Sequence, residues 1–186
     1  MSAPAESGLV VPVPAATPAV APWRERLDPS AVHGVPAHVT VLYPFVPPGE
    51  ISDSVVRELS ALFAAVEPFS FVLDRVEWFG DEVVYLAPTP DSPFVALTEA
   101  VHKRFPTYAP YGGAYDTITP HLTIGDRGDA AELRQAAVAV EPALPITARA
   151  SDVWLMVASS GVGAWRVHAR FPLGGRAASD GQQSTY

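Results

Sequence analysis

The chain contains no cysteine, which excludes disulfides, thiolate metal sites and cysteine nucleophiles. It also contains no apolar run long enough to span a bilayer. No basic residue precedes Arg24, and prolines interrupt the apolar N-terminal segment, a poor match to a signal peptide. These absences predict a cytoplasmic protein with no membrane partner.

Basic residues are scarce, with 12 Lys and Arg against 20 Asp and Glu and a formal net charge of -8. A protein that grips a long polyanion usually carries a basic face that displaces counterions, and the sequence shows no such cluster. A long duplex is therefore not expected as a partner. A small nucleotide phosphodiester or an RNA end remains compatible, because a few local donors suffice for one phosphate.

The chain has 186 residues, of which 48% are hydrophobic, enough for one domain with its own core. We predict a single domain over residues 8–173, a flexible tail over 1–7 and a disordered tail over 174–186, and we expect a monomer. The 20 prolines fall mostly between periodic segments and therefore punctuate the elements.

Alternation and helical periodicity predict two similar halves, each with a strand, a helix and a hairpin. Strands are expected at 8–14, 37–43, 69–79, 83–87, 120–125, 144–158 and 163–173, and helices at 17–27, 52–66, 92–105 and 129–140. Ser52 and Asp129 are expected to cap their helices. This order predicts an α+β fold: two antiparallel sheets from a pseudo-twofold repeat, helices on the outer faces and a central cleft.

Two short motifs occupy equivalent places in the halves, His38-Val39-Thr40 and His121-Leu122-Thr123. Residues i and i+2 of a strand share a face, so each histidine is expected to point with its threonine, opposite the apolar residues. If a pseudo-twofold relates the halves, both pairs converge on one cleft.

Two imidazoles and two hydroxyls suit phosphodiester cleavage. One neutral imidazole can take a proton from the attacking water while a second, protonated, donates to the leaving oxygen. The threonine hydroxyls can donate to the phosphate oxygens where charge builds up. This reaction needs no metal or cofactor, and we predict neither.

The stretches HVTVLYPF and PHLTIG resemble the two motifs of the 2H phosphoesterase superfamily, which includes 2′-5′ RNA ligase-like proteins and 2′,3′-cyclic nucleotide phosphodiesterases. The resemblance covers residues 8–173. It implies a bilobal α+β fold with His38, Thr40, His121 and Thr123 as catalytic residues. It further implies His121 as the base and His38 as the acid when a 2′,3′-cyclic phosphate opens to a 2′-phosphate.

Other candidate residues carry weaker patterns. The Tyr-rich loop before the second motif can supply a ring that stacks on a base, and Tyr115 is the predicted substrate-binding residue. His33 is expected in a solvent-exposed loop and His102 on a solvated helix end. His168 lies on a polar strand face with Arg166 and Arg170, for which exposure and phosphate contact both remain open.

Two alternatives to the phosphodiesterase remain at this stage. The histidines can instead ligate zinc in a metallohydrolase, although only Asp116 and Asp126 lie near the second motif. The same four residues can also bind a nucleotide or RNA end without cleaving it, because attack requires sub-ångström positioning.

Overall fold

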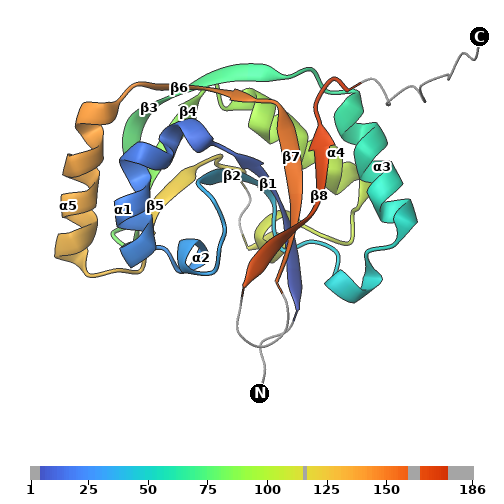
Figure 1. The fold of residues 1–186 in the computed structure, drawn as a ribbon, viewed down its shortest axis with the longest axis horizontal. Coiled ribbons are helices and arrows are strands. Elements are labelled where there is room, and N and C mark those ends of the chain that lie inside the picture. The colour runs from blue at the N-terminus through green and yellow to red at the C-terminus, as the bar shows by residue number, and fades with distance from the viewer. Residues whose placement is uncertain (1–4, 115–116, 159–163, 176–186) are drawn as a thin grey trace, which may run out of the picture.

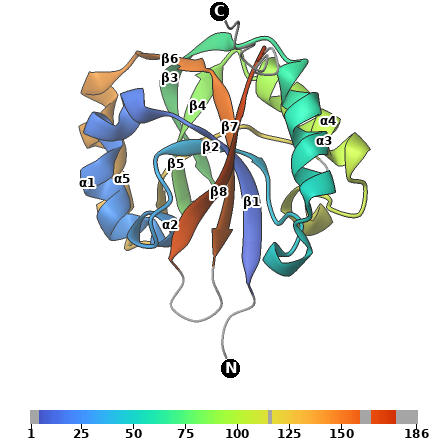
Figure 2. The same cartoon turned by 45° about the vertical axis from the view of Figure 1, so that its right-hand side comes forward.

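The structure is a computed structural model that describes residues 5–114, 117–158 and 164–175. Strands occupy the centre of the molecule and helices lie at its two sides (Figures 1 and 2). The strands form two four-stranded antiparallel sheets, which confirms the predicted α+β class. Among the described residues, no helix is long and apolar enough to cross a membrane.

The first sheet has the order β2-β1-β7-β8. Its strands are β1 (Glu6–Pro12), β2 (His38–Leu42), β7 (Asp152–Ala158) and β8 (Trp165–Pro172). β1 is central and pairs with both β2 and β7. The sheet therefore joins the first motif strand to the C-terminal hairpin of the chain.

The second sheet has the order β5-β4-β3-β6. Its strands are β3 (Phe69–Phe79), β4 (Val83–Thr89), β5 (Leu122–Asp126) and β6 (Ile146–Ala150). The second motif strand, β5, is at one edge, as β2 is in the first sheet. β2 and β5 also contact each other, so the two motif strands meet where the sheets adjoin.

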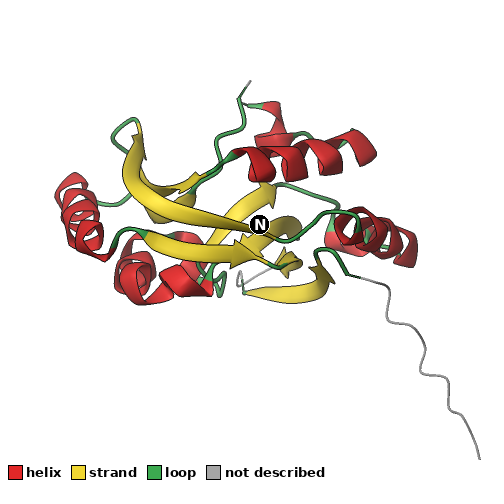
Figure 3. Cartoon of the chain, turned by 90° about the horizontal axis from the view of Figure 1, so that it is seen from above, coloured by secondary structure: helices red, strands yellow, loops and turns green. Residues whose placement is uncertain are grey.

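Helices from each half of the chain pack against strands of the other half. The α-helices of the described residues are α1 (Thr17–Leu27), α2 (Pro29–Val32), α3 (Asp53–Ala64), α4 (Ser92–Arg104) and α5 (Ala130–Val140). α1 packs against β5 and α5, whereas α4 packs against β2 and α3 packs against β8. Figure 3 shows the helices around the strands from above. Each motif strand is thus held from behind by a helix of the other half.

Local sequence explains most element ends. The Ser52 hydroxyl accepts from the amide of Val55, and the Asp129 carboxylate accepts from two amides, so both predicted caps are confirmed. Short 3-10 turns lie at Pro14–Ala16, Pro48–Glu50, Pro110–Gly113 and Glu141–Ala143.

Three sequence-based expectations need correction. The strand expected at 8–14 begins earlier, because β1 starts at Glu6. Ser7 is fully buried, and its hydroxyl donates to the Val46 carbonyl. The expected strand 144–158 is two strands in different sheets, β6 and β7, separated at Ser151. The segment after α1 contains the unpredicted turn α2. Of the tails predicted over 1–7 and 174–186, residues 1–4 and 176–186 lie outside the described residues.

Candidate active site

His38 and Thr40 share one face of β2. Val39 is fully buried on the opposite face, while His38 and Thr40 are only partly buried. Along β1, Val10 pairs with Thr40 but Leu9 pairs with Leu42, which leaves one extra residue in β2, a β-bulge. Because of this bulge, the side chain after Leu42 returns to the face of the histidine.

β5 repeats this geometry in the second half. Leu122 and Ile124 are fully buried, whereas Thr123 is partly buried on the other face. Along β4, Tyr85 pairs with Thr123 and Val84 with Gly125, so β5 also holds one extra residue directly after its motif threonine. Each half therefore presents its threonine and the residue five after its histidine on one face; His38 shares that face within β2, whereas His121 lies directly before β5. Those fifth residues are Tyr43 and Asp126.

A cleft of about 390 Å³ opens between the two motif strands. Its lining includes His38, Thr40 and Thr123, together with Tyr43 and Asp126. His121 is not part of this lining, but it lies close enough to His38 for its charge to lower the pKa of that imidazole, after burial as the main cause. The structure thus brings the two motifs together around one cleft.

Both imidazoles are anchored in the same way. Nδ1 of His38 lies 2.8 Å from the carbonyl oxygen of Pro36, and Nδ1 of His121 lies 2.7 Å from that of Thr119. A carbonyl oxygen only accepts, so each Nδ1 carries the proton and donates it. In the neutral ring, Nε2 is then the unprotonated nitrogen, with its lone pair available for proton transfer.

Burial makes both imidazoles harder to protonate. Burial lowers the pKa of His38 to about 4, and the nearby Arg24 guanidinium acts in the same direction. Burial also lowers the pKa of His121, partly opposed by its bond to Thr119 and by the carboxylate of Asp126. Both imidazoles are therefore neutral at neutral pH.

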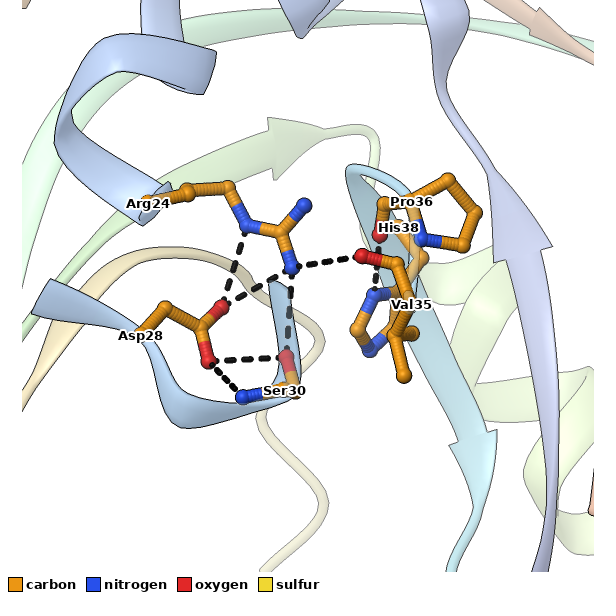
Figure 4. A network of polar contacts seen from close by, with 6 residues as sticks. All are labelled: Arg24, Asp28, Ser30, Val35, Pro36 and His38. Atoms are coloured by element: carbon orange, nitrogen blue, oxygen red, sulfur yellow. Dashed lines mark hydrogen bonds and ion pairs between the residues drawn. The ribbon is translucent and has the colours of Figure 1, made fainter. Parts of the chain in front are cut away.

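A buried polar network stands behind His38 (Figure 4). Arg24, near the end of α1, donates through Nε and Nη2 to Oδ2 of Asp28 at 3.0 and 2.9 Å, and both side chains are almost fully buried. Nη2 also reaches the Val35 carbonyl at 3.3 Å, and Asp28 accepts from the amide and hydroxyl of Ser30. The network ties α1 and α2 to the segment that leads into the first motif.

Aromatic rings stand beside His121. The Phe79 ring meets the imidazole edge-on with centroids 4.9 Å apart, and the Tyr85 ring lies 5.4 Å away. Tyr111 is nearly parallel to the imidazole at 6.3 Å, and its amide donates to the Tyr43 carbonyl. The second histidine is thus oriented by rings where the first is backed by charges.

Acidic groups, not basic ones, complete the described lining. Glu6, Asp28 and Asp126 line the cleft, and no Lys or Arg of the described chain does. Burial raises the pKa of Asp126, with Asp28 and Glu82 adding to the effect and Arg127 opposing it. One oxygen of Asp126 is buried without a hydrogen-bond partner among the described residues. An anion in this cleft would depend on hydroxyls and imidazoles for its contacts.

The weaker candidates separate clearly. Tyr115 and Asp116 lie outside the described residues, so the predicted substrate contact of Tyr115 stays a prediction. His33 is exposed, as expected, and also lines the cleft. His102 is partly buried and bonds the Tyr108 carbonyl at 3.0 Å instead of facing solvent freely. His168 is exposed on β8 and does not line the cleft.

Sequence reasoning missed the cleft residues outside the motifs, namely Glu6, Asp28, Ser30, Val35, Met156 and Trp165. Most come from β1, β7 and β8 or from the α2 segment, whose proximity to the motifs depends on sheet order. A local signal existed only for Tyr43 and Asp126, which both follow their histidine by five residues. That spacing becomes meaningful only once the two bulges are known.

In the described part of the chain, no group of three or more His, Asp or Glu side chains is placed to hold a metal ion. The described site contains imidazoles, hydroxyls and carboxylates.

Comparisons with known proteins agree with this geometry. A family model described as the 2′-5′ RNA ligase superfamily matches residues 11–161. A protein of Bacillus thuringiensis (strain Al Hakam) named as a phosphoesterase is 30% identical over 159 residues, covering 81% of this chain and 86% of its own length. A phosphoesterase by name from Bacillus cytotoxicus is 33% identical over 117 residues, which cover 59% of this chain and 62% of that protein.

Solved structures share the fold. The protein TT0787 of Thermus thermophilus matches with a TM-score of 0.59 and 18% identity, over 92% of this chain and 100% of that one. E. coli LigT complexed with 3′-AMP matches with a TM-score of 0.55 and 19% identity, over 92% and 99%. With the family match over most of the chain, these findings show that the chain belongs to the 2′-5′ RNA ligase superfamily, within the 2H phosphoesterases.

Proposed function

We propose that the chain is a metal-independent phosphodiesterase that hydrolyses 2′,3′-cyclic or 2′-5′-linked phosphates of nucleotides or RNA ends by two-histidine acid–base catalysis. The matched anchoring of the two imidazoles carries the proposal. Each Nδ1 is committed to a carbonyl two residues earlier, which leaves Nε2 for proton transfer. The E. coli LigT structure complexed with 3′-AMP, a fold relative, supports a nucleotide as the ligand class.

The reaction on a 2′,3′-cyclic phosphate balances with these residues alone. The base imidazole takes a proton from water as the water oxygen bonds to phosphorus. The P–O3′ bond breaks, and O3′ takes the proton held by the other imidazole, which leaves a 2′-phosphate. Thr40 and Thr123 donate to the non-bridging oxygens. Since burial favours the neutral form of both imidazoles, the negative charge of the substrate must favour protonation of one of them.

Neighbouring charges favour His121 as the proton donor. Burial lowers the pKa of His38 to about 4, with Arg24 and Asp28 acting on it in opposite directions, whereas the charge of Asp126 raises the pKa of His121. In the hydrolytic direction we therefore assign His38 as base and His121 as acid, the reverse of the assignment implied by the resemblance. The two roles exchange in the reverse reaction.

The test is hydrolysis of 2′,3′-cyclic nucleotides with chelator present. We expect turnover by the wild-type protein and a loss of at least about 10²–10⁴-fold in His38→Ala and in His121→Ala. His168→Ala, on an exposed strand position outside the cleft, is the matched control and should retain activity. Unchanged turnover in both motif variants, or complete loss with chelator alone, contradicts the proposal. Nucleotide binding without turnover favours a binding module instead.

A further inference from the structure

Beside the two motifs, the cleft has an apolar wall that the proposed reaction does not use. Val10, Val35 and Met156 form a small buried cluster separate from the main core, with Trp165 packed against it. All four line the cleft. Val10 pairs with Thr40 across β1 and β2, so this cluster covers the sheet face that carries the first motif. Apolar side chains that line a cleft next to polar groups indicate room for an apolar part of a ligand.

Two aromatic rings border this wall. Tyr43 and Trp165 meet edge to face, with centroids 6.1 Å apart and planes at 61°. Gly8 makes space for the tyrosine, because a Cβ there would lie 3.2 Å from its ring carbon Cδ2. The backbone amide of Trp165 donates to the His33 carbonyl at 2.7 Å, which fixes the start of β8 beside the first motif. The half-buried indole of Trp165 is thus fixed in position and can stack on a planar ligand group.

An acceptor lies at the same wall. Glu6 lines the cleft, and its Oε2 accepts from the Tyr43 hydroxyl at 2.6 Å. Among the described residues, Glu6 forms no ion pair, and Oε1 accepts no hydrogen bond. A carboxylate oxygen can only accept while ionised, so it selects ligand groups with N–H donors. Guanine offers two adjacent donors, N1–H and the 2-amino group, on one edge.

We infer that Trp165, Tyr43 and Glu6 form a nucleobase subsite that stacks the base of the substrate and prefers guanine. The inference rests on the proposed function, since it names the base whose ribose phosphate lies at the two His-x-Thr motifs. Stacking places the base against the wall formed by Val10 and Met156. Glu6 then accepts from the guanine edge, while the Tyr43 hydroxyl keeps the carboxylate oriented.

The first experiment compares kcat/KM for the 2′,3′-cyclic phosphates of guanosine, adenosine, cytidine and uridine, and for a base-free phosphodiester, bis(p-nitrophenyl) phosphate. In Trp165→Ala we expect a loss of roughly 5- to 150-fold on the nucleotides, mostly in KM, because base stacking is worth about 1–3 kcal/mol. Activity on the base-free diester should be retained. Glu6→Gln should remove the preference for guanine over the other three bases.

Trp154→Phe is the matched control, since Trp154 contacts the same cluster but does not line the cleft, and its ring lies under Arg170. Wild-type activity without base preference, or equal losses on nucleotides and base-free diester in Trp165→Ala, overturns the subsite and leaves the phosphodiesterase intact. An oligonucleotide that ends in guanosine 2′,3′-cyclic phosphate separates an RNA end from a free nucleotide: both should depend on Trp165.

A binding measurement separates the subsite from the reaction. Guanosine 2′-phosphate should quench tryptophan fluorescence in wild-type protein and bind more weakly to Trp165→Ala. Ribose 5-phosphate, without a base, should bind both proteins alike. If no substrate is turned over yet this base-dependent binding is present, the subsite stands and the phosphodiesterase proposal fails. If guanosine 2′-phosphate binds both proteins equally, the subsite fails.

Discussion

Behind His38 lies a buried ion pair, whereas beside His121 lie aromatic rings. The two strands otherwise match: the same His-x-Thr order, the same Nδ1 contact to a carbonyl two residues earlier, and the same bulge after the threonine. The inner geometry of the site is thus repeated, while its support is not. The reacting groups therefore share one arrangement in the two halves, whereas their supporting side chains differ in kind.

The residues five after each histidine extend this contrast. Tyr43 bonds to Glu6 at 2.6 Å, and burial with this bond raises the pKa of Tyr43 to about 12. Oδ1 of Asp126 instead accepts no hydrogen bond from the described residues, and its nearest cation is the exposed Arg127, with Nε 3.6 Å away. The first half therefore presents a neutral hydroxyl at the position where the second half presents a carboxyl group. This asymmetry gives the two neutral imidazoles different neighbours and hence different tendencies to hold a proton.

The largest effect is expected from breaking the support of His38. Arg24→Met leaves Asp28 buried without its partner, which costs about 3–5 kcal/mol of unfolding free energy. The control is Arg26→Met, because Arg26 pairs with Glu132 on the surface and is more than half exposed, so less than about 1 kcal/mol is expected. Urea denaturation measures both. Equal losses of unfolding free energy in Arg24→Met and Arg26→Met would show that the buried network behind His38 does not stabilise the protein more than a surface ion pair does.

Removing each threonine hydroxyl tests whether the two threonines, which occupy matching positions, also contribute equally to the reaction. In the proposed reaction, Thr40→Val and Thr123→Val should each lower kcat by about 10²–10³-fold, the usual effect of losing one donor to the developing charge. Valine keeps the branched shape that suits a strand. Thr147→Val, at an exposed position of β6, is the control. A large loss in only one motif variant would break the symmetry of the site.

His38 and His121 should contribute differently to the pH dependence of the free energy of unfolding. Burial holds the pKa of His38 near 4 in the folded protein, against 6.5 for the free side chain, so the folded state favours the neutral ring. The resulting stability is complete above pH 6.5 and is lost as the pH falls towards 4, at about 1.4 kcal/mol per pH unit. Thermal or urea unfolding between pH 7 and 5 should show this loss in wild-type protein.

His38→Gln should flatten that pH dependence. His121→Gln should flatten it less, because Asp126 favours protonation of His121, whereas the charges of Arg24 and Asp28 act on His38 in opposite directions. A larger flattening in His121→Gln would contradict this ranking of the two environments, and it would favour His38 as the proton donor.

The reacting groups were predictable from the sequence, and their supports were not. His38 and Thr40 could be assigned to one face because strand alternation is local, and Ser52 and Asp129 could be assigned as caps for the same reason. Arg24 reads as an ordinary charged residue near a helix end. Its burial against Asp28 follows from α1 packing on β5 of the other half, which no local pattern encodes.

The division of residues 144–158 was hidden for a related reason. Both halves of that segment are rich in strand-forming residues, so periodicity favours one long strand. In the structure β6 joins the second sheet and β7 the first, and the break at Ser151 is set by tertiary pairing. The same pairing brings Met156 and Trp165 to the cleft, so the candidate base subsite could not be found before the sheet order was known.

The smallest effect is expected from the rings beside His121. Phe79→Leu removes the edge contact to the imidazole and the stack on Tyr85, whose centroid lies 4.3 Å away. Such ring pairs are worth about 0.5–1.5 kcal/mol, and the Phe79 side chain is 37% exposed, so the loss in unfolding free energy should stay in that range. Tyr85→Phe keeps the rings and removes only the long 3.4 Å bond to Glu77, and it should change little. If Phe79→Leu instead destabilises the protein as much as Arg24→Met, the rings beside His121 stabilise the fold as strongly as the ion pair behind His38. The two halves would then differ in the chemistry of these supports but not in their contribution to the free energy of unfolding.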